Sequence, residues 1–213
     1  MTVKRIFPHT DLYGITAEEY SRGRTNIEVV EELVRHGIRI IQYRAKEKSP
    51  RERYRECLAL RKITREAGVV LIVNDHIDLA IAVEADGVHV GQDDLPVPVV
   101  RRLVGETMLI GLSTHSPAQA LAAVTAGADY LGVGPVFATA TKKDVVSPVG
   151  LEYVKYVAEQ ISLPFVVIGG IKEHNIGQVR ASGGRCFALV TEIVGAANIG
   201  QKAAALRKLI SGG

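Results

Sequence analysis

Short apolar segments alternate with longer amphipathic segments eight times along this chain of 213 residues. Short apolar runs rich in Val, Ile and Leu are typical of buried strands, and the segments between them carry apolar residues at helical spacing. A strand buried on both faces needs helices to cover it, as in a parallel sheet. We therefore predict strands at 12–15, 39–44, 69–73, 88–90, 109–112, 130–133, 165–168 and 187–190, and helices at 27–36, 50–67, 79–83, 96–104, 117–126, 151–160, 172–182 and 203–210.

Eight such units predict an α/β fold, a single (β/α)8 TIM barrel near the small end of the size range of that fold. Predicted helices run through a glycine directly into the next strand at Gly68, Gly127 and Gly183, as short helix-to-strand connections do. The alternative is a doubly wound open sheet, which would show a glycine-rich phosphate motif after its first strand. The segment that begins at Leu12 has no such motif. No linker divides the sequence, so we expect one domain over residues 1–213.

Composition excludes several classes of protein. The chain has 26 Lys and Arg against 23 Asp and Glu, and the basic residues are scattered, which is not typical of a nucleic-acid-binding surface. No apolar run approaches the ~20 residues that span a membrane, and the first residues lack the apolar core of a signal peptide. Cys57 and Cys186 show no disulfide or metal spacing. We expect a cytoplasmic protein with small-molecule substrates; the oligomeric state stays open, a homo-oligomer included.

Polar residues gather where the predicted strands end, which is the rim where TIM barrels carry their active sites. Each strand from the second to the eighth contributes to this set. Its members are Gln42, Arg44, Lys46, Asn74, Asp75, Gln92, Asp93, Asp94, Ser113, Thr114, His115, Thr139, Thr141, Lys142, Lys143, Gly169, Gly170 and Thr191.

This set predicts a site for a metal-bound diphosphate. Arg44, Lys46 and Lys142 can converge with the Ser113 hydroxyl on phosphate oxygens through charge-assisted hydrogen bonds, so we take these four as the catalytic residues. Asp75 and Asp94 would repel a diphosphate unless a cation lay between them. Mg²⁺ resolves the conflict, because it commonly binds one or two carboxylates together with substrate phosphate oxygens. The alternative is that both aspartates are helix N-caps.

A second anion site is predicted after strands seven and eight. Gly169 and Gly170, together with Thr191, occupy the position where barrels often bind phosphate through backbone N–H groups. The alternative is that the glycines only make a tight turn. The long loop at 134–149 is predicted to be a lid whose Lys142 reaches the leaving phosphate; the alternative is a solvated basic loop. We expect His89 to be packed in or near the barrel.

Taken together, these motifs resemble the thiamine phosphate synthases, in the superfamily that also contains thiazole tautomerases, over almost the whole chain. The segments that carry the resemblance are Gln42-x-Arg44-x-Lys46, Val73-Asn74-Asp75, residues 87–94, residues 111–115, residues 132–144 and residues 168–171. One departure follows the last strand. The family usually has Val-Ser-Ala-Ile there, whereas this chain has Val190-Thr191-Glu192-Ile193, which keeps a hydroxyl and adds a negative charge. Glu192 would either weaken the binding of thiazole phosphate or point to solvent. Two smaller departures are Gly183-Gly-Arg-Cys186 in place of the usual Gly-Ala-Asp-Gly and Ala138 in place of the usual proline.

The resemblance implies a (β/α)8 barrel that joins a hydroxymethylpyrimidine diphosphate to a thiazole phosphate and releases pyrophosphate. It implies Mg²⁺ as the cofactor, bound by Asp75 and Asp94. The residues implied for the pyrimidine diphosphate are Gln42, Arg44, Lys46, Asn74, Ser113 and Lys142, and those for the thiazole phosphate are Thr139, Ala140, Thr141, Gly170, Val190 and Thr191.

Two other functions compete with this one. A thiazole tautomerase would share the barrel and the second phosphate site, but it needs neither metal nor diphosphate. A non-catalytic sensor of thiazole phosphate would bind that ligand without releasing pyrophosphate. Because the cations and carboxylates Arg44, Lys46, Lys142, Asp75 and Asp94 would be unnecessary in a tautomerase, the sequence favours the synthase.

Overall fold

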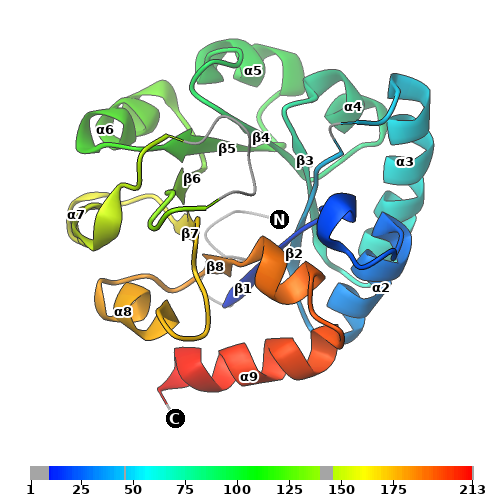
Figure 1. The fold of residues 1–213 in the computed structure, drawn as a ribbon. Helices are drawn as coiled ribbons and strands as arrows, with labels where there is room; N and C mark the ends of the chain where they lie inside the picture. Colours follow the sequence, from blue (N-terminus) through cyan, green and yellow to red (C-terminus); the bar gives the residue numbers. More distant parts are fainter. Residues whose placement is uncertain (1–9, 46, 140–145, 213) are drawn as a thin grey trace.

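The computed structural model describes residues 10–45, 47–139 and 146–212, and it confirms the barrel. All eight strands are parallel, each pairs with its neighbour in sequence, and β1 pairs with β8 to close the cylinder (Figure 1). The strands are β1 Leu12–Ile15, β2 Ile40–Tyr43, β3 Val70–Asn74, β4 Gly87–Val90, β5 Leu109–Thr114, β6 Tyr130–Val133, β7 Phe165–Ile168 and β8 Phe187–Ala188.

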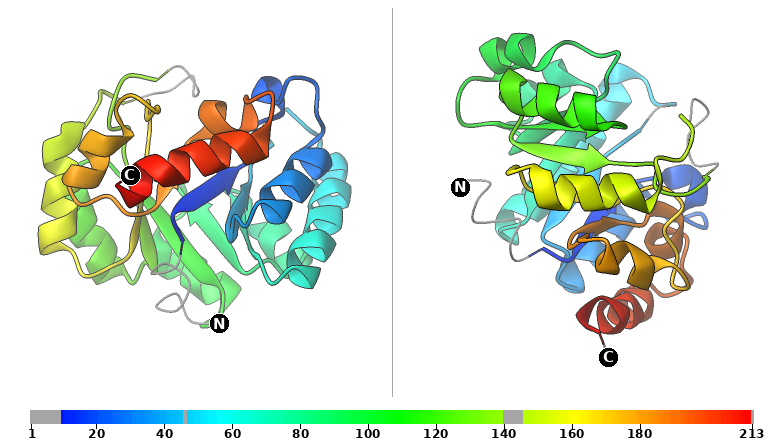
Figure 2. Two further views of the ribbon diagram at one scale, coloured as in Figure 1. Left: turned by 90° about the horizontal axis from the view of Figure 1, so that it is seen from below. Right: turned by 90° about the vertical axis from the view of Figure 1, so that its left-hand side faces the viewer.

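Helices surround the barrel on its outside, and the last of them lies along α2 and α8 (Figure 2). The α-helices are α2 Asn26–Arg35, α3 Pro50–Glu66, α4 Ile77–Ala82, α5 Val97–Val104, α6 Pro117–Ala126, α7 Gly150–Gln160, α8 Ile176–Ala181 and α9 Ile199–Ser211. A 3₁₀ turn, η2 Glu18–Tyr20, follows β1, and a π-helical turn, η3 Val190–Val194, follows β8. Within the described residues, no helix has the length and apolar character needed to cross a membrane.

The sequence sets helix starts through local hydrogen bonds. Thr25 and Ser49 each accept a hydrogen bond from the backbone N–H three residues on, and the glutamate at that position bonds back to the cap. This reciprocal pair satisfies two N–H groups that the helix itself leaves open. Pro50 then occupies the first turn of α3, where its missing N–H costs nothing. The predicted start at Ser49-Pro50 is confirmed.

Apolar side chains form two separate layers. The inner layer fills the barrel, and the outer layer lies between the strands and the helices. Alternation along each strand sends successive side chains to opposite faces, so that one strand supplies both layers. Tyr13 and Tyr130 belong to the inner layer and are almost fully buried, whereas Leu12 and Leu131 belong to the outer one. The hydroxyl groups of Tyr13 and Tyr130 bring polar atoms into the inner layer.

The two ends of the barrel differ in how their carboxylates are used. At the end where strands begin, Asp86 forms two hydrogen bonds with Arg61 at 2.7 and 3.1 Å and accepts the Leu71 N–H at 2.8 Å. Asp129 is bound in the same way by Arg101 and by the backbone N–H of β5. Because both carboxylates already have cationic partners, we interpret them as stabilising the fold. The end where strands finish is the candidate for chemistry.

Several predicted boundaries differ from the structure, and three of the differences have a clear local cause. The eighth strand stops at Ala188 instead of residue 190, because Val190 belongs to the π-helical turn η3. The helix predicted from residue 172 begins at Ile176, since the Asn175 side chain closes the preceding turn by accepting the Lys172 N–H at 2.7 Å. The last helix begins at Ile199, ahead of residue 203, because the Asn198 side chain caps it.

Candidate active site

The predicted site residues that the structure describes lie on one rim of the barrel. Parallel strands end on the same side, and β2 through β5 are consecutive neighbours in the cylinder. Gln42 and Asn74 are strand residues, Ser113 lies near the end of β5, and Arg44, Asp75 and Asp94 lie in the connections that follow β2, β3 and β4. Lys46, Ala140, Thr141, Lys142 and Lys143 fall outside the described residues.

Arg44 is a buried cation at this rim. Its side chain is 8% exposed, and its nearest described carboxylate oxygen belongs to Glu19, at 3.6 Å. The backbone of Arg44 is fixed, because its N–H donates to the Thr16 hydroxyl at 2.8 Å and that hydroxyl donates back to the Arg44 carbonyl at 3.1 Å. Among the described residues, its Nε has no hydrogen-bond partner. A buried guanidinium with an unused donor favours the binding of an anion.

A chain of hydrogen bonds crosses the inside of the barrel between two predicted site residues. The Gln42 Nε2 amide donates to the Tyr13 hydroxyl at 3.1 Å, and the Tyr13 and Tyr130 hydroxyls lie 3.0 Å apart. His89 continues the chain, with Nδ1 3.0 Å from the Tyr130 hydroxyl and Nε2 3.0 Å from Ser113 Oγ. The prediction that His89 packs inside the barrel is therefore confirmed. Sequence reasoning missed both tyrosines; their inward positions on β1 and β6 were the available signal.

The direction of this chain follows from its first member. An amide nitrogen only donates, so Tyr13 accepts from Gln42 and passes its own hydrogen to Tyr130. Tyr130 then donates to His89 Nδ1, which leaves the hydrogen of the imidazole on Nε2, where it donates to Ser113 Oγ. In this order each buried hydroxyl hydrogen of the tyrosines has an acceptor, which avoids the free-energy cost of an unsatisfied donor. The Ser113 hydrogen is thus available to donate to a ligand.

The buried tyrosines make stability fall in alkaline solution. Burial raises the pKa of Tyr13 and Tyr130 above the ordinary value of 10. Their contribution to stability is complete below pH 10 and is lost as the pH rises toward the folded-state pKa, because only the unfolded chain ionises there. Between pH 8 and pH 10.5 we expect the free energy of unfolding to fall by about 0.8 kcal/mol for each of them.

Urea unfolding at a series of pH values measures this loss. Tyr130→Phe should show a decline that is shallower than wild type by that amount, whatever its stability at pH 8. Tyr54→Phe, at an exposed tyrosine of α3, provides the matched control. Equal declines for wild type and Tyr130→Phe would contradict the expectation.

Asp75 and Asp94 are not helix N-caps, so that alternative was wrong. His76 occupies the N-cap position of α4 and Pro96 that of α5. Asp94 Oδ2 accepts the Gly91 N–H at 2.6 Å, inside the connection that follows β4. Asp75 has a positive φ of 61°, a left-handed conformation that few residues other than glycine adopt and that clusters at functional sites. Both carboxylates are exposed at the rim.

Gly169 and Gly170 make a turn that no other residue type would fit. Their φ values are 98° and 63°. A Cβ on Gly170 would lie 2.6 Å from the Ala138 carbonyl oxygen, in the connection that follows β6. The Asn175 side-chain amide donates a hydrogen bond to the Gly170 carbonyl at 3.0 Å, which stabilises the turn. The glycine pair makes a tight turn, as one interpretation predicted. The turn also lies after β7, where barrels often bind phosphate, so the second interpretation stays a prediction.

Comparison with known proteins identifies the family. A family model described as thiamine monophosphate synthase matches residues 12–193. The chain belongs to the thiamine monophosphate synthase family. It is 65% identical to the thiamine-phosphate synthase of Pelotomaculum thermopropionicum over 94% of this chain and 92% of that protein, and 54% identical to the enzyme of the same name from Caldicellulosiruptor bescii over 97% and 94%.

A solved structure agrees with this membership. Thiamine phosphate pyrophosphorylase from Pyrococcus furiosus superposes with a TM-score of 0.85 at 35% sequence identity, over 94% of this chain and 95% of that one. These relatives of the chain are named as enzymes. The family resemblance inferred from the sequence is therefore confirmed. The individual roles of the rim residues stay predictions.

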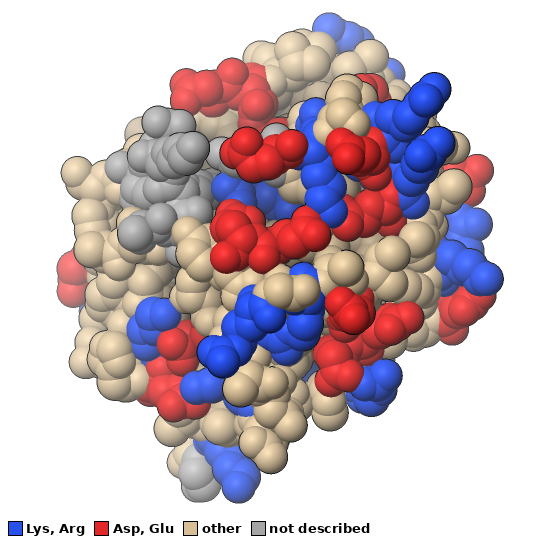
Figure 3. Space-filling view, turned by 45° about the vertical axis from the view of Figure 1, so that its right-hand side comes forward, with Lys and Arg blue, Asp and Glu red and all other residues tan. Residues whose placement is uncertain are grey.

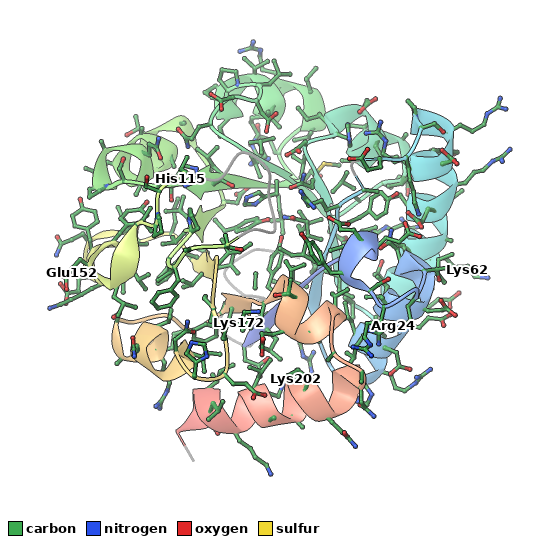
Figure 4. The ribbon with its side chains drawn as sticks, viewed as in Figure 1. Arg24, Lys62, His115, Glu152, Lys172 and Lys202 are labelled. Carbon is green, nitrogen blue, oxygen red and sulfur yellow. The ribbon has the colours of Figure 1, made fainter. Side chains whose placement is uncertain are left out.

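His115 and Lys172 are two further polar residues at the rim (Figure 4). His115 Nδ1 lies 2.5 Å from the carbonyl oxygen of Gly134, which follows β6, and the backbone N–H of His115 donates to Gln119 Oε1 at 2.7 Å. Lys172 was not predicted as a site residue. Its ammonium donates to the Thr191 hydroxyl at 2.8 Å, which places a cation beside a residue predicted to bind phosphate.

Proposed function

We propose that this protein joins 4-amino-2-methyl-5-(diphosphooxymethyl)pyrimidine to a thiazole phosphate, giving thiamine phosphate and pyrophosphate. The observation that carries the proposal is the buried Arg44, whose Nε donates to none of the residues that the structure describes, on the same rim as Asp75 and Asp94 in a member of this family. A tautomerase or a sensor that binds only a monophosphate has no use for this combination.

The rim chemistry fits Mg²⁺. Its carboxylate oxygens are hard donors of the type that Mg²⁺ prefers. Over residues 10–45, 47–139 and 146–212, no group of three or more His, Cys, Asp and Glu side chains could hold a metal by itself. An ion held by Asp75 and Asp94 would therefore need further oxygen ligands from a substrate, which a diphosphate can supply. When bound there, Mg²⁺ would neutralise charge on the leaving diphosphate.

The reaction needs no nucleophile from the protein. The bond between the pyrimidine methylene carbon and the diphosphate oxygen breaks, and its electron pair leaves with the diphosphate. The aminopyrimidine ring stabilises the resulting carbocation, and the lone pair of the thiazole nitrogen forms the new carbon–nitrogen bond. The protein is left to bind, orient and exclude water.

Particular side chains supply these functions in the proposal. Arg44, together with Lys46 and Lys142, stabilises the negative charge that develops on the leaving group. The Ser113 hydroxyl, held by His89 Nε2 at 3.0 Å, donates to an acceptor atom of the pyrimidine. Gln42 orients the ring from the other end of the hydrogen-bond chain. Because one continuous series of hydrogen bonds holds both Gln42 and Ser113, these two side chains are oriented before the pyrimidine binds.

Assays of pyrophosphate release test the proposal. We expect stoichiometric pyrophosphate and thiamine phosphate when the pyrimidine diphosphate, the thiazole phosphate and Mg²⁺ are all present, and loss of product when any one is omitted or EDTA is added. Interconversion of thiazole phosphate tautomers without pyrophosphate would identify a tautomerase. Thiazole phosphate binding with no turnover would identify a sensor. Either result would overturn the proposal.

A further inference from the structure

Lys172 lies at the edge of the predicted monophosphate site in a fixed backbone position. It follows β7 directly after the glycine turn and Ile171. Asn175, which is 8% exposed, accepts the Lys172 N–H at 2.7 Å and donates to the Gly170 carbonyl at 3.0 Å. One buried amide therefore ties the lysine to the glycine turn. The position of the Lys172 backbone is therefore coupled to that of the glycine turn.

The Lys172 ammonium faces the other half of the same site. It donates to Thr191 Oγ1 at 2.8 Å and lies 3.1 Å from Glu192 Oε1. Because Thr191 accepts from Lys172, the hydroxyl hydrogen of Thr191 is directed elsewhere and can meet a phosphate oxygen. An ammonium has three hydrogens, so Lys172 keeps one that neither contact uses. Its side chain is 36% exposed, and a ligand can reach it.

Glu192 is compensated by two lysines and does not act as an isolated negative charge. Its second carboxylate oxygen lies 3.5 Å from Lys202 Nζ on α9, and Lys202 also bonds to Glu173 at 2.8 Å. Figure 4 shows the labelled Lys172 and Lys202 near η3, the turn that carries Glu192. Lys202 is cationic at neutral pH, as lysine ordinarily is, and the hydrogen bond to Glu173 raises its pKa further. Glu192 retains a cationic partner if Lys172 turns to a ligand.

The surroundings of this cluster are not broadly basic. Its two lysines, Lys172 and Lys202, contact two glutamates, Glu192 and Glu173. In the face shown in Figure 3, Lys and Arg side chains likewise lie next to Asp and Glu side chains. A phosphate here must be recognised by short-range contacts. Lys172 and the Thr191 hydroxyl can each donate a hydrogen bond to a phosphate oxygen. The glycine turn has no side chain, so a phosphate can approach its backbone closely.

We propose that Lys172 is a direct ligand of the phosphate group of the thiazole substrate and that Glu192, balanced by Lys202, positions it. This inference rests on the proposed function, since it names a further binding residue for that substrate. It also explains the departure at residue 192: the negative charge beside the phosphate site orients a lysine and is neutralised by it.

Lys172→Met tests the proposal, because methionine keeps most of the side-chain length and removes the charge. Loss of one charge-assisted hydrogen bond should raise the KM for thiazole phosphate about 10- to 100-fold. The KM for the pyrimidine diphosphate should change less than twofold, and kcat less than threefold. Lys172→Arg should restore most of the affinity. Lys62→Met, on the exposed face of α3, loses the same charge far from the rim and should behave as wild type.

Calorimetry without turnover separates this inference from the proposed function. Thiazole phosphate and the corresponding dephosphorylated thiazole alcohol are titrated into wild type, Lys172→Met and Lys62→Met. We expect Lys172→Met to lose affinity for the phosphate and not for the alcohol. Unchanged affinity for the phosphate, or an equal loss for both ligands, would overturn the role of Lys172. Failure of wild type to release pyrophosphate would instead defeat the proposed reaction and leave the binding result valid.

Discussion

An Asp75→Asn, Asp94→Asn double variant is expected to release pyrophosphate at least about a thousandfold more slowly than wild type, in keeping with the loss of electrostatic stabilisation of a leaving group. Both aspartates lie at the rim that carries Arg44, after the adjacent strands β3 and β4. Asparagine keeps the size of the side chain and can adopt the left-handed conformation of residue 75. The variant therefore changes charge with little change in backbone.

Two measurements make this expectation decisive. Steady-state pyrophosphate release gives the rate, and titration with Mn²⁺ in the presence of the pyrimidine diphosphate gives the affinity for a divalent ion, which should fall along with it. Asp93→Asn is the matched control, because Asp93 is an exposed carboxylate next to Asp94 and is not assigned to the metal. Near-normal turnover by the double variant would refute the assignment of Asp75 and Asp94.

Gly111→Ala is expected to lower the free energy of unfolding by about 1–3 kcal/mol, the usual cost of overpacking a core, and to remove most of the activity. Gly111 lies on β5, and a Cβ at this position would overlap the Tyr130 ring and His89 Nδ1. Both rings are buried and belong to the chain that ends at Ser113, so neither can move aside without breaking a hydrogen bond.

A matched alanine substitution separates overpacking from the general effect of replacing glycine. Gly177, near the start of α8, has no atom within 4 Å of the position where a Cβ would lie. Gly177→Ala should leave stability unchanged or raise it by up to about 1 kcal/mol, because alanine suits a helix better than glycine. Thermal unfolding and pyrophosphate release measure both variants. A Gly111→Ala protein as stable and active as wild type would show that the interior can rearrange.

Local hydrogen bonding explains which element boundaries the sequence predicted well. The start of α3 depends on Ser49, Pro50 and Glu52, all within one turn, and it was predicted correctly. The start of α8 depends on Asn175 bonding both to Lys172 and to the Gly170 carbonyl on the glycine turn. That contact exists only once the turn has formed, so helical periodicity alone placed the start too early.

The candidate site divides in the same way. Gln42, Arg44, Asn74 and Ser113 were predicted from their positions at or just after strands, and the closed barrel brings their strand ends to one rim. Tyr13 and Tyr130 are 117 residues apart in the sequence, and their hydroxyl contact depends on closure of the barrel. Lys172 lies in the connection between β7 and α8, Lys202 lies on α9, and the two meet Glu192 only in the folded chain.

By itself, the sequence determined the alternation of strands and helices, the rim at which polar residues gather and the family, because apolar periodicity and strand-end motifs are local properties of the chain. Only the tertiary structure decided the direction of the hydrogen bonds inside the barrel, the surroundings of Arg44 and the pairing of Lys172 with Glu192. Those properties depend on which side chains from distant strands share a space that excludes water, and closure of the cylinder determines that.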